Sequence, residues 1–558
     1  INPTEAMKKI LYTALFLAPL SLWAQEETGD EVKSVEIRVV EDYKAQVRSA
    51  HKISEQPSFA DTTSEKLAVT VRIQPKGMVI DFDPDPIPSI QLGRVKLPKL
   101  PTQKVSLGAG NFTGTYASFV LSSPRSKKNV WGIKALHDGT LSGVNSPFYT
   151  QPTYENTLLA DFQRATKNWN VKTQALLQAN YHSFFGALDA GQVDTVSGSW
   201  QQSYGLNQQW LRTSNPTSKV LATYRSGGIS YLYTHAGFAT SEHLAATAHT
   251  VELEAGDKEI VLDLGYQFSQ YNGWSATGGQ YHNFTIAPVT RGKNGILTYE
   301  FGLDFTGTQT AGLNQDRFEF YVFPRVNLQA EILRRTLAIY GGWDGSSKQQ
   351  TLRGLLQEVP QISLDQELRL SGQNRGYVGM QGALIGKVQY RLEGAMTFMN
   401  DAVQFFRDTV LSPVEVDGAF LPAFSVGYAE QVLKTSFRGE LNIPLKQFTA
   451  STYAQFNAFA GDQYLGREGQ VFGGLLSYAI NDLRIAAAVK YVGGRYVPSS
   501  YGSGLESYTD VNLQLGYEIN ENLSISLRAY NLLNQDYQTY LGYHVRGTRG
   551  LFVLNYQF

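Results

Sequence analysis

The sequence predicts an all-β protein: a transmembrane antiparallel β-barrel of about 22 strands, preceded by a short N-terminal segment in the periplasm or the lumen. Apolar and polar residues alternate from about residue 104 to the end of the chain, in runs of ten residues or more. A strand tilted at about 45° needs roughly nine to eleven residues to cross the hydrocarbon layer, so these runs are long enough to span a membrane. The chain also ends in an aromatic residue, Phe558, at the close of such a run.

The composition excludes several other classes of protein. The 558 residues include 17% charged residues, no cysteine, 52 glycines and 32 tyrosines, and the formal net charge is −1. A nearly neutral chain is poorly suited to nucleic acid as a partner, because phosphate binding requires clustered lysine and arginine. The lack of cysteine in the sequence excludes disulfide scaffolds, thiolate metal sites and cysteine nucleophiles. Low charge with much glycine and tyrosine is typical of a sheet-rich envelope protein.

Residues 1–24 are expected to comprise a few upstream residues and a signal peptide. The stretch from Met7 to Ala24 begins with two lysines, continues as a mostly apolar run and ends before a charged segment. This is the three-part layout of a secretory signal, with cleavage expected after Ala24. A transmembrane anchor is the weaker alternative, because the apolar run is short and Pro19 interrupts it.

Residues 25–103 are predicted to form an N-terminal extension with a proline-rich linker. Five of the 20 prolines of the chain fall between Pro84 and Pro101. The segment 81–86 places three aspartates at alternate positions, but Pro86 and Leu92 stand where a calcium loop requires glycine and glutamate. We therefore interpret this segment as an extended linker. The sequence leaves open whether the extension lies in the lumen, lies in the periplasm or binds a partner.

Residues 104–558 are predicted to form the barrel. Between 169 and 182, for example, Val171 and Leu177 share one face while Lys172 and Gln174 share the other. The same alternation recurs at 297–306, 388–398 and 433–443. A soluble sandwich would also alternate, but its strands are mostly about five or six residues long. Lipid cannot satisfy an exposed sheet edge, so strands of this kind must close into a barrel.

Short connections between the alternating runs set the strand number. Ten candidate periplasmic turns would join eleven hairpins and so give 22 strands, an even number as expected for a bacterial single-chain barrel. The longest irregular stretches, around 345–373 and 401–421, then fall on the extracellular side. The ten turns lie near residues 122–129, 164–168, 212–218, 255–258, 291–295, 333–335, 386–387, 443–447, 480–482 and 519–522.

The C-terminal run carries the signal expected of a barrel for the assembly machinery of the outer membrane. Phe552, Leu554, Tyr556 and Phe558 share one strand face. On an ordinary edge strand these side chains would form an exposed apolar edge, which soluble proteins avoid. We therefore expect outer-membrane lipid and, during biogenesis, the barrel-assembly machinery as partners of a multi-pass barrel in a Gram-negative outer membrane.

Charged residues of both signs fall on the opposite, inward strand face, and these are the candidate lumen-lining residues. Charged lumen residues are a general feature of water-filled or protein-filled barrels, so they do not by themselves identify a solute. The candidates are Lys172, Glu300, Asp304, Arg391, Glu393, Arg438, Glu440, Glu518 and Arg528.

Motifs for catalysis, cofactors and metals are not found in the sequence. It contains no GxSxG, HExxH, phosphate-loop or dinucleotide fingerprint. His243 and His249 share a strand face but have no third ligand nearby, so we interpret them as ordinary lumen or loop residues. We expect no catalytic, cofactor-binding or metal-binding residues and hence not an enzyme.

The two ends of the predicted mature chain resemble a known family. Residues 525–558 resemble the last two strands of TonB-dependent receptors, and this resemblance implies a barrel of 22 strands. Segments 39–57 and 104–123 are similar to a plug-lacking group of receptor-like outer-membrane proteins from the Bacteroidetes. The positions that match the receptor ending are Asn531, Leu532, Tyr537, Gly547 and Phe558.

The sequence departs from that family in its N-terminal part. The family carries a plug domain inside the barrel, whereas only 79 residues lie from Gln25 to Gln103. Residues 34–42 have the character of a TonB-box strand, although β-prone runs of this kind are common, and TonB stays an uncertain partner. Without a plug, energy-coupled import loses its mechanical basis.

Two functions remain open on the sequence. The first is transport or passage of solutes across the outer membrane by a receptor-type barrel without a plug. The alternative is a non-transporting structural or accessory subunit of an outer-membrane machine that assembles or exports proteins, together with other outer-membrane or periplasmic subunits.

Overall fold

The computed structural model describes residues 101–558 except 125, 127, 145–150, 184–197, 214–217, 236–238, 273–277, 312–315, 363–367, 385–386, 408–423, 462–467, 496–504 and 541–542. The expected signal peptide, the TonB-box segment and nearly all of the extension therefore lie outside the described residues. Within the described part of the chain, no helix is both long and apolar enough to span a membrane.

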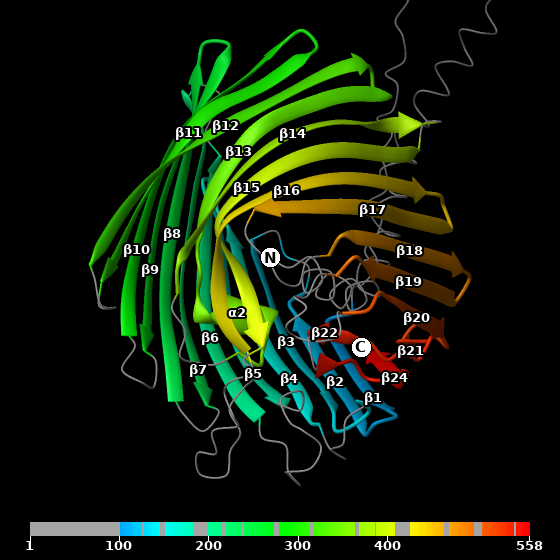
Figure 1. Ribbon diagram of the computed structural model, residues 1–558. Coiled ribbons are helices and arrows are strands. Elements are labelled where there is room, and N and C mark those ends of the chain that lie inside the picture. The colour runs from blue at the N-terminus through cyan, green and yellow to red at the C-terminus, as the bar shows by residue number, and fades with distance from the viewer. Residues whose placement is uncertain are drawn as a thin grey trace, which may run out of the picture. The chain divides into compact units, whose positions relative to one another are not determined.

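Twenty-two strands form one antiparallel sheet that closes on itself as a barrel (Figure 1). Among the described residues, two further short strands and one short helix belong to connections between barrel strands. The barrel strands are β1 Gln103–Gly110, β2 Gly114–Ser122, β3 Asn129–Thr140, β4 Thr153–Ala165, β5 Asn170–Ser183, β6 Gly198–Thr213, β7 Val220–His235, β8 Ala239–Ala255, β9 Lys258–Asn272, β10 Gly278–Asn294, β11 Leu297–Ala311, β12 Arg317–Leu333, β13 Leu337–Gln349, β14 Leu370–Leu384, β15 Val388–Arg407, β16 Phe424–Pro444, β17 Phe448–Gly461, β18 Gln470–Ile480, β19 Leu483–Gly493, β20 Tyr508–Glu518, β21 Leu523–Tyr530 and β24 Arg549–Gln557. The other elements are α2 Leu352–Glu358, β22 Gln538–Tyr540 and β23 Tyr543–His544.

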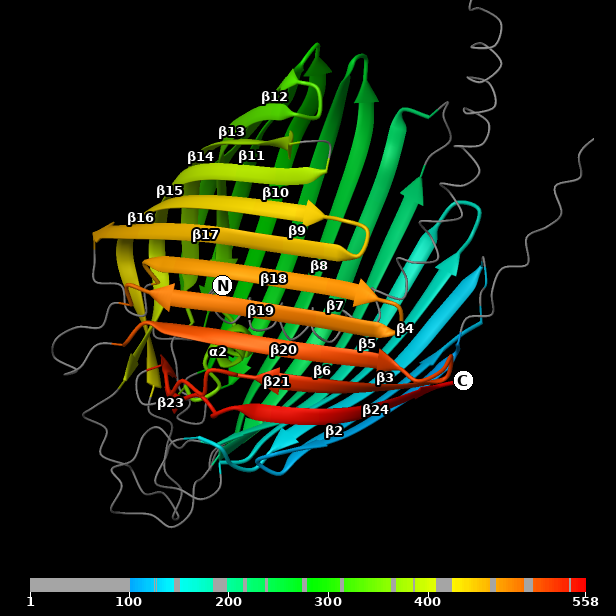
Figure 2. The same ribbon diagram turned by 90° about the vertical axis from the view of Figure 1, so that its right-hand side faces the viewer.

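The barrel closes where the first and last strands pair. β1 lies antiparallel to both β2 and β24, with Val105 opposite Tyr556 and Leu107 opposite Leu554 in the β24 register (Figure 2). β21 pairs directly with β24, so β22 and β23 stand apart from the barrel wall as a separate two-stranded sheet. Closure satisfies the backbone groups that an open edge would expose to lipid. The prediction of a closed 22-stranded barrel is confirmed.

Short turns connect the strands at one end of the barrel, and each of the ten predicted turn regions lies at one of these connections. The turn from β8 to β9 has Gly256 at φ 67°, and the turn from β10 to β11 has Gly295 at φ 58°. Asn481 occupies the same left-handed region, with φ 48°, between β18 and β19. These are residues that tolerate a positive φ in tight turns. By analogy with outer-membrane barrels this end is periplasmic and the other is extracellular.

The outer face of the barrel is apolar, as the alternation predicts. Leu177 lies opposite Leu158 on β4 and Tyr204 on β6, and all three side chains are at least 40% exposed. Phe552 and Phe558 are 52% and 49% exposed, so the C-terminal aromatic run faces outward. The neighbouring Leu551 and Val553 are fully buried on the opposite face of β24.

One predicted irregular stretch proves to be partly regular. β13 runs on to Gln349 and β14 starts at Leu370, so the stretch 345–373 contracts to a loop of residues 350–369 that contains α2. The second stretch also contracts, because β15 continues to Arg407, and its remainder lies outside the described residues.

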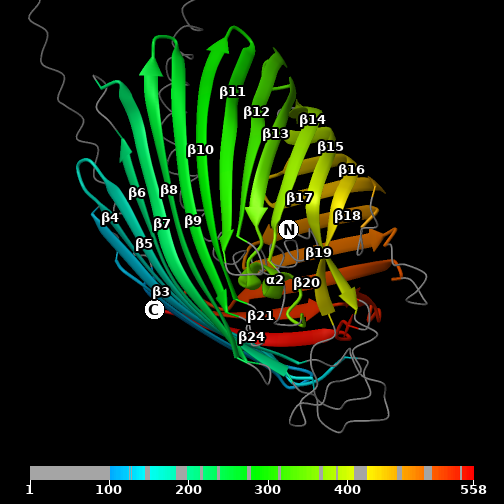
Figure 3. The same ribbon diagram turned by 60° about the vertical axis from the view of Figure 1, so that its left-hand side comes forward.

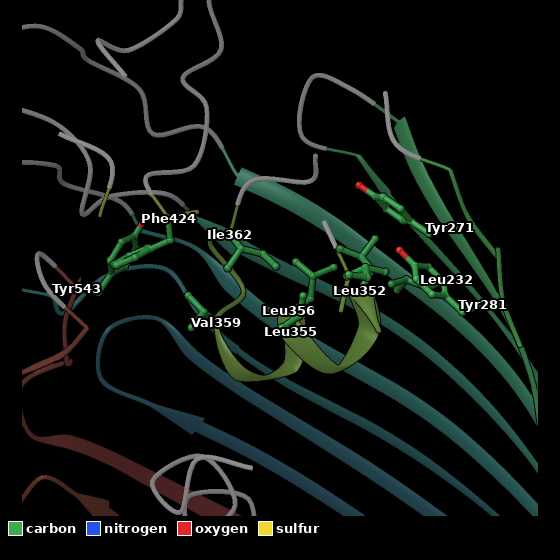
Figure 4. Packing of buried hydrophobic residues seen from close by; sticks show 11 residues of the cluster. Leu232, Tyr271, Tyr281, Leu352, Leu355, Leu356, Val359, Ile362, Phe424 and Tyr543 are labelled. Carbon is green, nitrogen blue, oxygen red and sulfur yellow. The ribbon is translucent and has the colours of Figure 1, made fainter. Parts of the chain in front are cut away.

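A buried apolar cluster lies at the extracellular end and is centred on α2 (Figure 4). We call it the mouth cluster, because its members come from the inner face of the barrel and from extracellular connections. They are Leu232, Tyr271, Tyr281, Leu352, Leu355, Leu356, Val359, Ile362, Leu368, Phe424 and Tyr543.

The connection from β21 to β24 contains four of the five positions that match the receptor ending. Asn531 adopts φ 48° and its Nδ2 donates to the carbonyl oxygens of Gln535 and Arg546, at 3.0 and 2.9 Å. The ring of Tyr537 stacks on Tyr508 with 3.9 Å between centroids. These contacts organise a connection that would otherwise be a long loop.

Candidate functional site

The inner wall of the barrel is the candidate site, because it carries the predicted charged residues. On β11, Phe301 and Leu303 are exposed on the outer face, so Glu300 and Asp304 lie on the inner face. The same reasoning places the charged positions of β15 and β16 inside, since Leu392, Met396 and Phe437 are exposed outside.

A network centred on Glu393 joins three strands of this wall. Arg391 donates to Oε2 of Glu393 at 2.8 Å, and Arg375 of β14 donates to Oε1 of the same carboxylate. Tyr340 of β13 donates to Oε2 at 3.0 Å and accepts from Nε of Arg391 at 2.8 Å. One carboxylate is therefore shared by two guanidinium groups and a phenol.

A second group lies beside it on β16 and β17. Nε of Arg438 donates to Glu440 at 2.6 Å and its NH1 donates to Gln455 at 2.9 Å, while the guanidinium stacks 4.7 Å from the ring of Tyr453. Arg391, Glu393, Arg438 and Glu440 together line a cavity of about 130 Å³. A cavity of that size holds a few water molecules.

Two more clusters involve predicted residues on β11. Arg325 of β12 bridges Asp304 and Asp263 of β9, with both N–O distances at 3.0 Å. Nε of Arg291 on β10 donates to Glu300 at 2.8 Å. Across the inner face, Arg325 therefore ties β12 to β11 and β9, and Arg291 ties β10 to β11.

The remaining predicted residues lie apart from these groups. Glu518 pairs with Arg484 of β19 at 2.8 Å. Arg528 is 3% exposed and its guanidinium lies 4.7 Å from the ring of Tyr116. Lys172 has an exposed side chain. The nine predicted charges are therefore spread over the wall and do not form one compact site.

The role of these pairs in stability is small, which points to another role. The side chains of Arg391, Arg438 and Glu440 are 48%, 42% and 41% exposed, and ion pairs with such exposure typically contribute about 0–1 kcal/mol. What they do supply is a polar stretch of wall in which charges of opposite sign are paired. Such a wall can exchange hydrogen bonds with a polar solute without a strong preference for one sign of charge.

Sequence reasoning missed the partners of the predicted charges. Arg375, Arg325 and Tyr340 occupy inner-face positions of strands whose residues alternate between apolar and polar. This alternation in the sequence could have indicated that they face inward. Which of them meet depends on the register between strands, and that register is seen only in the structure.

The interpretation of His243 and His249 as ordinary lumen or loop residues is wrong in its placement. The ring of His243 lies 4.6 Å from the ring of Tyr231, and Nε2 of His249 accepts from Arg225 at 3.2 Å. Both histidines have the strand parity of the outer face, because His249 lies opposite the exposed Leu264. Among the residues that the structure describes, no group of three potential metal ligands was found.

Comparison with known proteins gives matches at the level of structure. No family model matches the sequence, and no curated protein matches it. The FrpB iron transporter from Neisseria meningitidis superposes with a TM-score of 0.65 and 9% identity, covering 83% of this chain and 82% of that one. The copper transporter OprC superposes with a TM-score of 0.61 and 9% identity, covering 82% of this chain and 80% of that one. The ferripyoverdine receptor of the outer membrane of Pseudomonas aeruginosa superposes with a TM-score of 0.61 and 12% identity, covering 83% of this chain and 73% of that one.

These neighbours are TonB-dependent outer-membrane receptors with 22-stranded barrels. The resemblance inferred from the C-terminal motif is therefore confirmed at the level of the barrel. The closed sheet, the apolar outer face and these neighbours agree on one conclusion. The chain has the 22-stranded barrel fold of these transporters and receptors.

Proposed function

We propose that the protein allows solutes to pass across the outer membrane through a receptor-type barrel that lacks a plug domain of its own. The observation that carries this proposal is the inner wall, where balanced pairs of charges line a closed barrel. A solute path needs a polar surface that keeps its hydration, and the half-exposed pairs around Arg391 and Arg438 provide one. The names of the structural neighbours describe transporters and receptors, which supports the same class.

The proposal assigns a role to each part of the chain. Residues 1–24 direct export and are removed, residues 25–103 form an extension too short for a plug, and residues 104–558 form the barrel. The outward run that ends at Phe558 serves as the signal for the barrel-assembly machinery, and the exposed apolar face contacts outer-membrane lipid. No catalytic step is part of this proposal.

The proposed passage is tested by conductance in planar bilayers. We expect the purified protein to conduct, and we expect Arg438→Gln and Glu440→Gln to shift the reversal potential in a salt gradient in opposite directions. The matched control is Lys446→Gln, because Lys446 is exposed in the turn between β16 and β17 and should leave the selectivity unchanged. A bilayer that stays silent with wild-type protein under all conditions, or equal shifts in the three variants, would contradict the proposal.

A second function is supported by the mouth cluster. A barrel that holds a packed segment, α2 and the cluster around it, at its extracellular end suits a non-transporting subunit of an assembly or export machine. Extraction in mild detergent through a tag on an extracellular loop, followed by mass spectrometry, separates the two functions. Stoichiometric envelope proteins in the particle favour the machine subunit, and a lone barrel favours passage of solutes.

A further inference from the structure

The loop between β13 and β14 contains a folded segment that the barrel itself does not require. Thr351 caps α2, with its Oγ1 accepting from the backbone N–H of Gly354 at 3.1 Å. Leu352, Leu355 and Leu356 are at most 2% exposed. A helix of seven residues is not stable alone, so the packing of these leucines holds it in place.

The N-terminal end of the segment is attached to the inner face of β7 and β8. The carboxylate of Glu242 on β8 accepts from the backbone N–H groups of Leu352 and Arg353, at 2.7 and 3.1 Å. The guanidinium of Arg353 donates to the carbonyl oxygen of Tyr231 on β7 at 3.0 Å. Glu242 is 1% exposed, so its carboxylate is held inside the protein by this contact.

The electrostatics at this end follow from burial. Burial lowers the pKa of Arg353 below its ordinary value, and the nearby Glu242 acts in the opposite direction. The first backbone N–H groups of a helix have no partner within the helix, and Glu242 supplies an acceptor for two of them. Loss of this carboxylate would leave these donors unpaired in a buried place.

The C-terminal end of the segment is attached to two other parts of the barrel. Ile362 forms a parallel bridge with Phe424, the first residue of β16. The hydroxyl of Tyr540 on β22 donates to the carbonyl oxygen of Glu358 at 3.0 Å. The ring of Phe424 lies 5.5 Å from the ring of Tyr543, which joins these two attachments (Figure 4).

The three attachments are spread around the barrel. In the closed order of strands, β16 lies eight strands beyond β8, and β24, which follows β22 and β23, lies six strands beyond β16. A segment that follows one wall could not contact all three sectors. Figure 3 shows α2 within the ring of strands.

We infer that residues 350–362 form a strap that crosses the extracellular mouth of the lumen and narrows it, with Glu242 as the positioning residue that holds the strap down. This inference rests on the proposed passage of solutes only where it says what the strap obstructs. The position of the strap is supported by the contacts described above, which do not depend on transport.

The first experiment measures the strap without measuring transport. The natural chain has no cysteine, so Leu356→Cys provides a single thiol whose reaction with a membrane-impermeant maleimide reports exposure of the strap. We expect slow labelling with Glu242 present and labelling about tenfold faster after Glu242→Ala. Glu242→Gln keeps one oxygen acceptor and should fall between the two.

Glu254→Ala is the matched control, because Glu254 lies on the same strand and face but at the other end of β8 and is exposed. It should leave labelling unchanged. Heat-dependent mobility on gels confirms that each variant forms a folded barrel. Fast labelling of Leu356→Cys with Glu242 present, or equal rates in the Glu242→Ala and Glu254→Ala backgrounds, would overturn the strap.

The second experiment tests whether the strap narrows the mouth. Ile362→Cys with Phe424→Cys places two thiols at bridge positions, where a disulfide can form. We expect the oxidised pair to show lower conductance than the reduced pair, and Glu242→Ala to show higher conductance than wild type. Equal conductance in all of these, in a barrel that conducts, would overturn narrowing of the mouth by the strap. A barrel that never conducts, even in Glu242→Ala with fast labelling, would overturn both the narrowing and the proposed passage. The labelling result would still support the attachment of the strap by Glu242.

Discussion

Substitution of Leu177 by arginine tests the assignment of the lipid-facing surface most directly. At the two ends of β5 and β6, aromatic pairs mark two levels: Trp169, just before β5, lies 5.9 Å from Trp210, and Tyr181 lies 5.2 Å from Trp200. The twelve-residue separation of Trp169 and Tyr181 is about 40 Å along an extended strand, or about 28 Å across a membrane at a 45° tilt. This agrees with an apolar band about 25 Å tall between two aromatic girdles.

Leu177 lies two residues from the middle of that span and is 43% exposed on the outer face. Arginine near the bilayer midplane destabilises an outer-membrane barrel by about 2–4 kcal/mol. We therefore expect Leu177→Arg to lower the free energy of unfolding by that amount, measured by tryptophan fluorescence during reversible urea unfolding in lipid vesicles.

The control for this measurement is Gln174→Arg. Gln174 has the parity of the inner face and lies opposite Asp161 of β4 and Asn207 of β6, so a cation there stays in a polar environment. We expect a change below about 1 kcal/mol. Equal losses of stability in the two variants would refute the assignment of the faces of β5.

Three other outcomes follow from the same structure. Val171→Arg should cost only about 0–1 kcal/mol in that unfolding assay, because Val171 lies next to the periplasmic start of β5; a loss as large as that of a midplane arginine would show that the membrane band is misplaced. Gly342→Ala should destabilise the barrel by about 1–3 kcal/mol, since the new Cβ would overlap the carbonyl oxygen of Val326. Gly394→Ala is the control, because its Cβ would meet open space and should leave the stability unchanged. Equal midpoints of thermal unfolding in the two variants would contradict this reasoning. Deletion of Phe558 should lower the amount of barrel in the outer membrane of cells and leave folding into detergent micelles unchanged. If the deletion also prevents folding into micelles, Phe558 acts on stability instead of assembly.

Much of the fold could be predicted because it depends on local pattern. A period of two separates the two faces of each strand, and a tight turn leaves a local signature such as the Asn481 position at a positive φ. The strand number follows from these two signals together. The boundaries of the loops were less predictable, since β13 and β15 extend into stretches that the sequence predicts to be irregular.

The helix α2 could not be predicted from the sequence. Its seven residues are too few to show a helical period, and its leucines are buried only because Leu232, Tyr271 and Tyr281 come from other strands to cover them. The strap attachments show the same limit, since Glu242 is 110 residues from Leu352 and Tyr540 is 182 residues from Glu358.

The sequence by itself predicted a barrel of long amphipathic strands, because alternation along a strand requires no knowledge of its neighbours. The outward placement of His243 and His249 came only from the structure. Only the tertiary structure decided which charges meet and what fills the mouth. Arg375 meets Glu393 through the register of β14 and β15, and Glu242 meets α2 through the curvature of a closed sheet. Contacts of this kind depend on how strands distant in sequence are brought together, and local pattern carries no information about that.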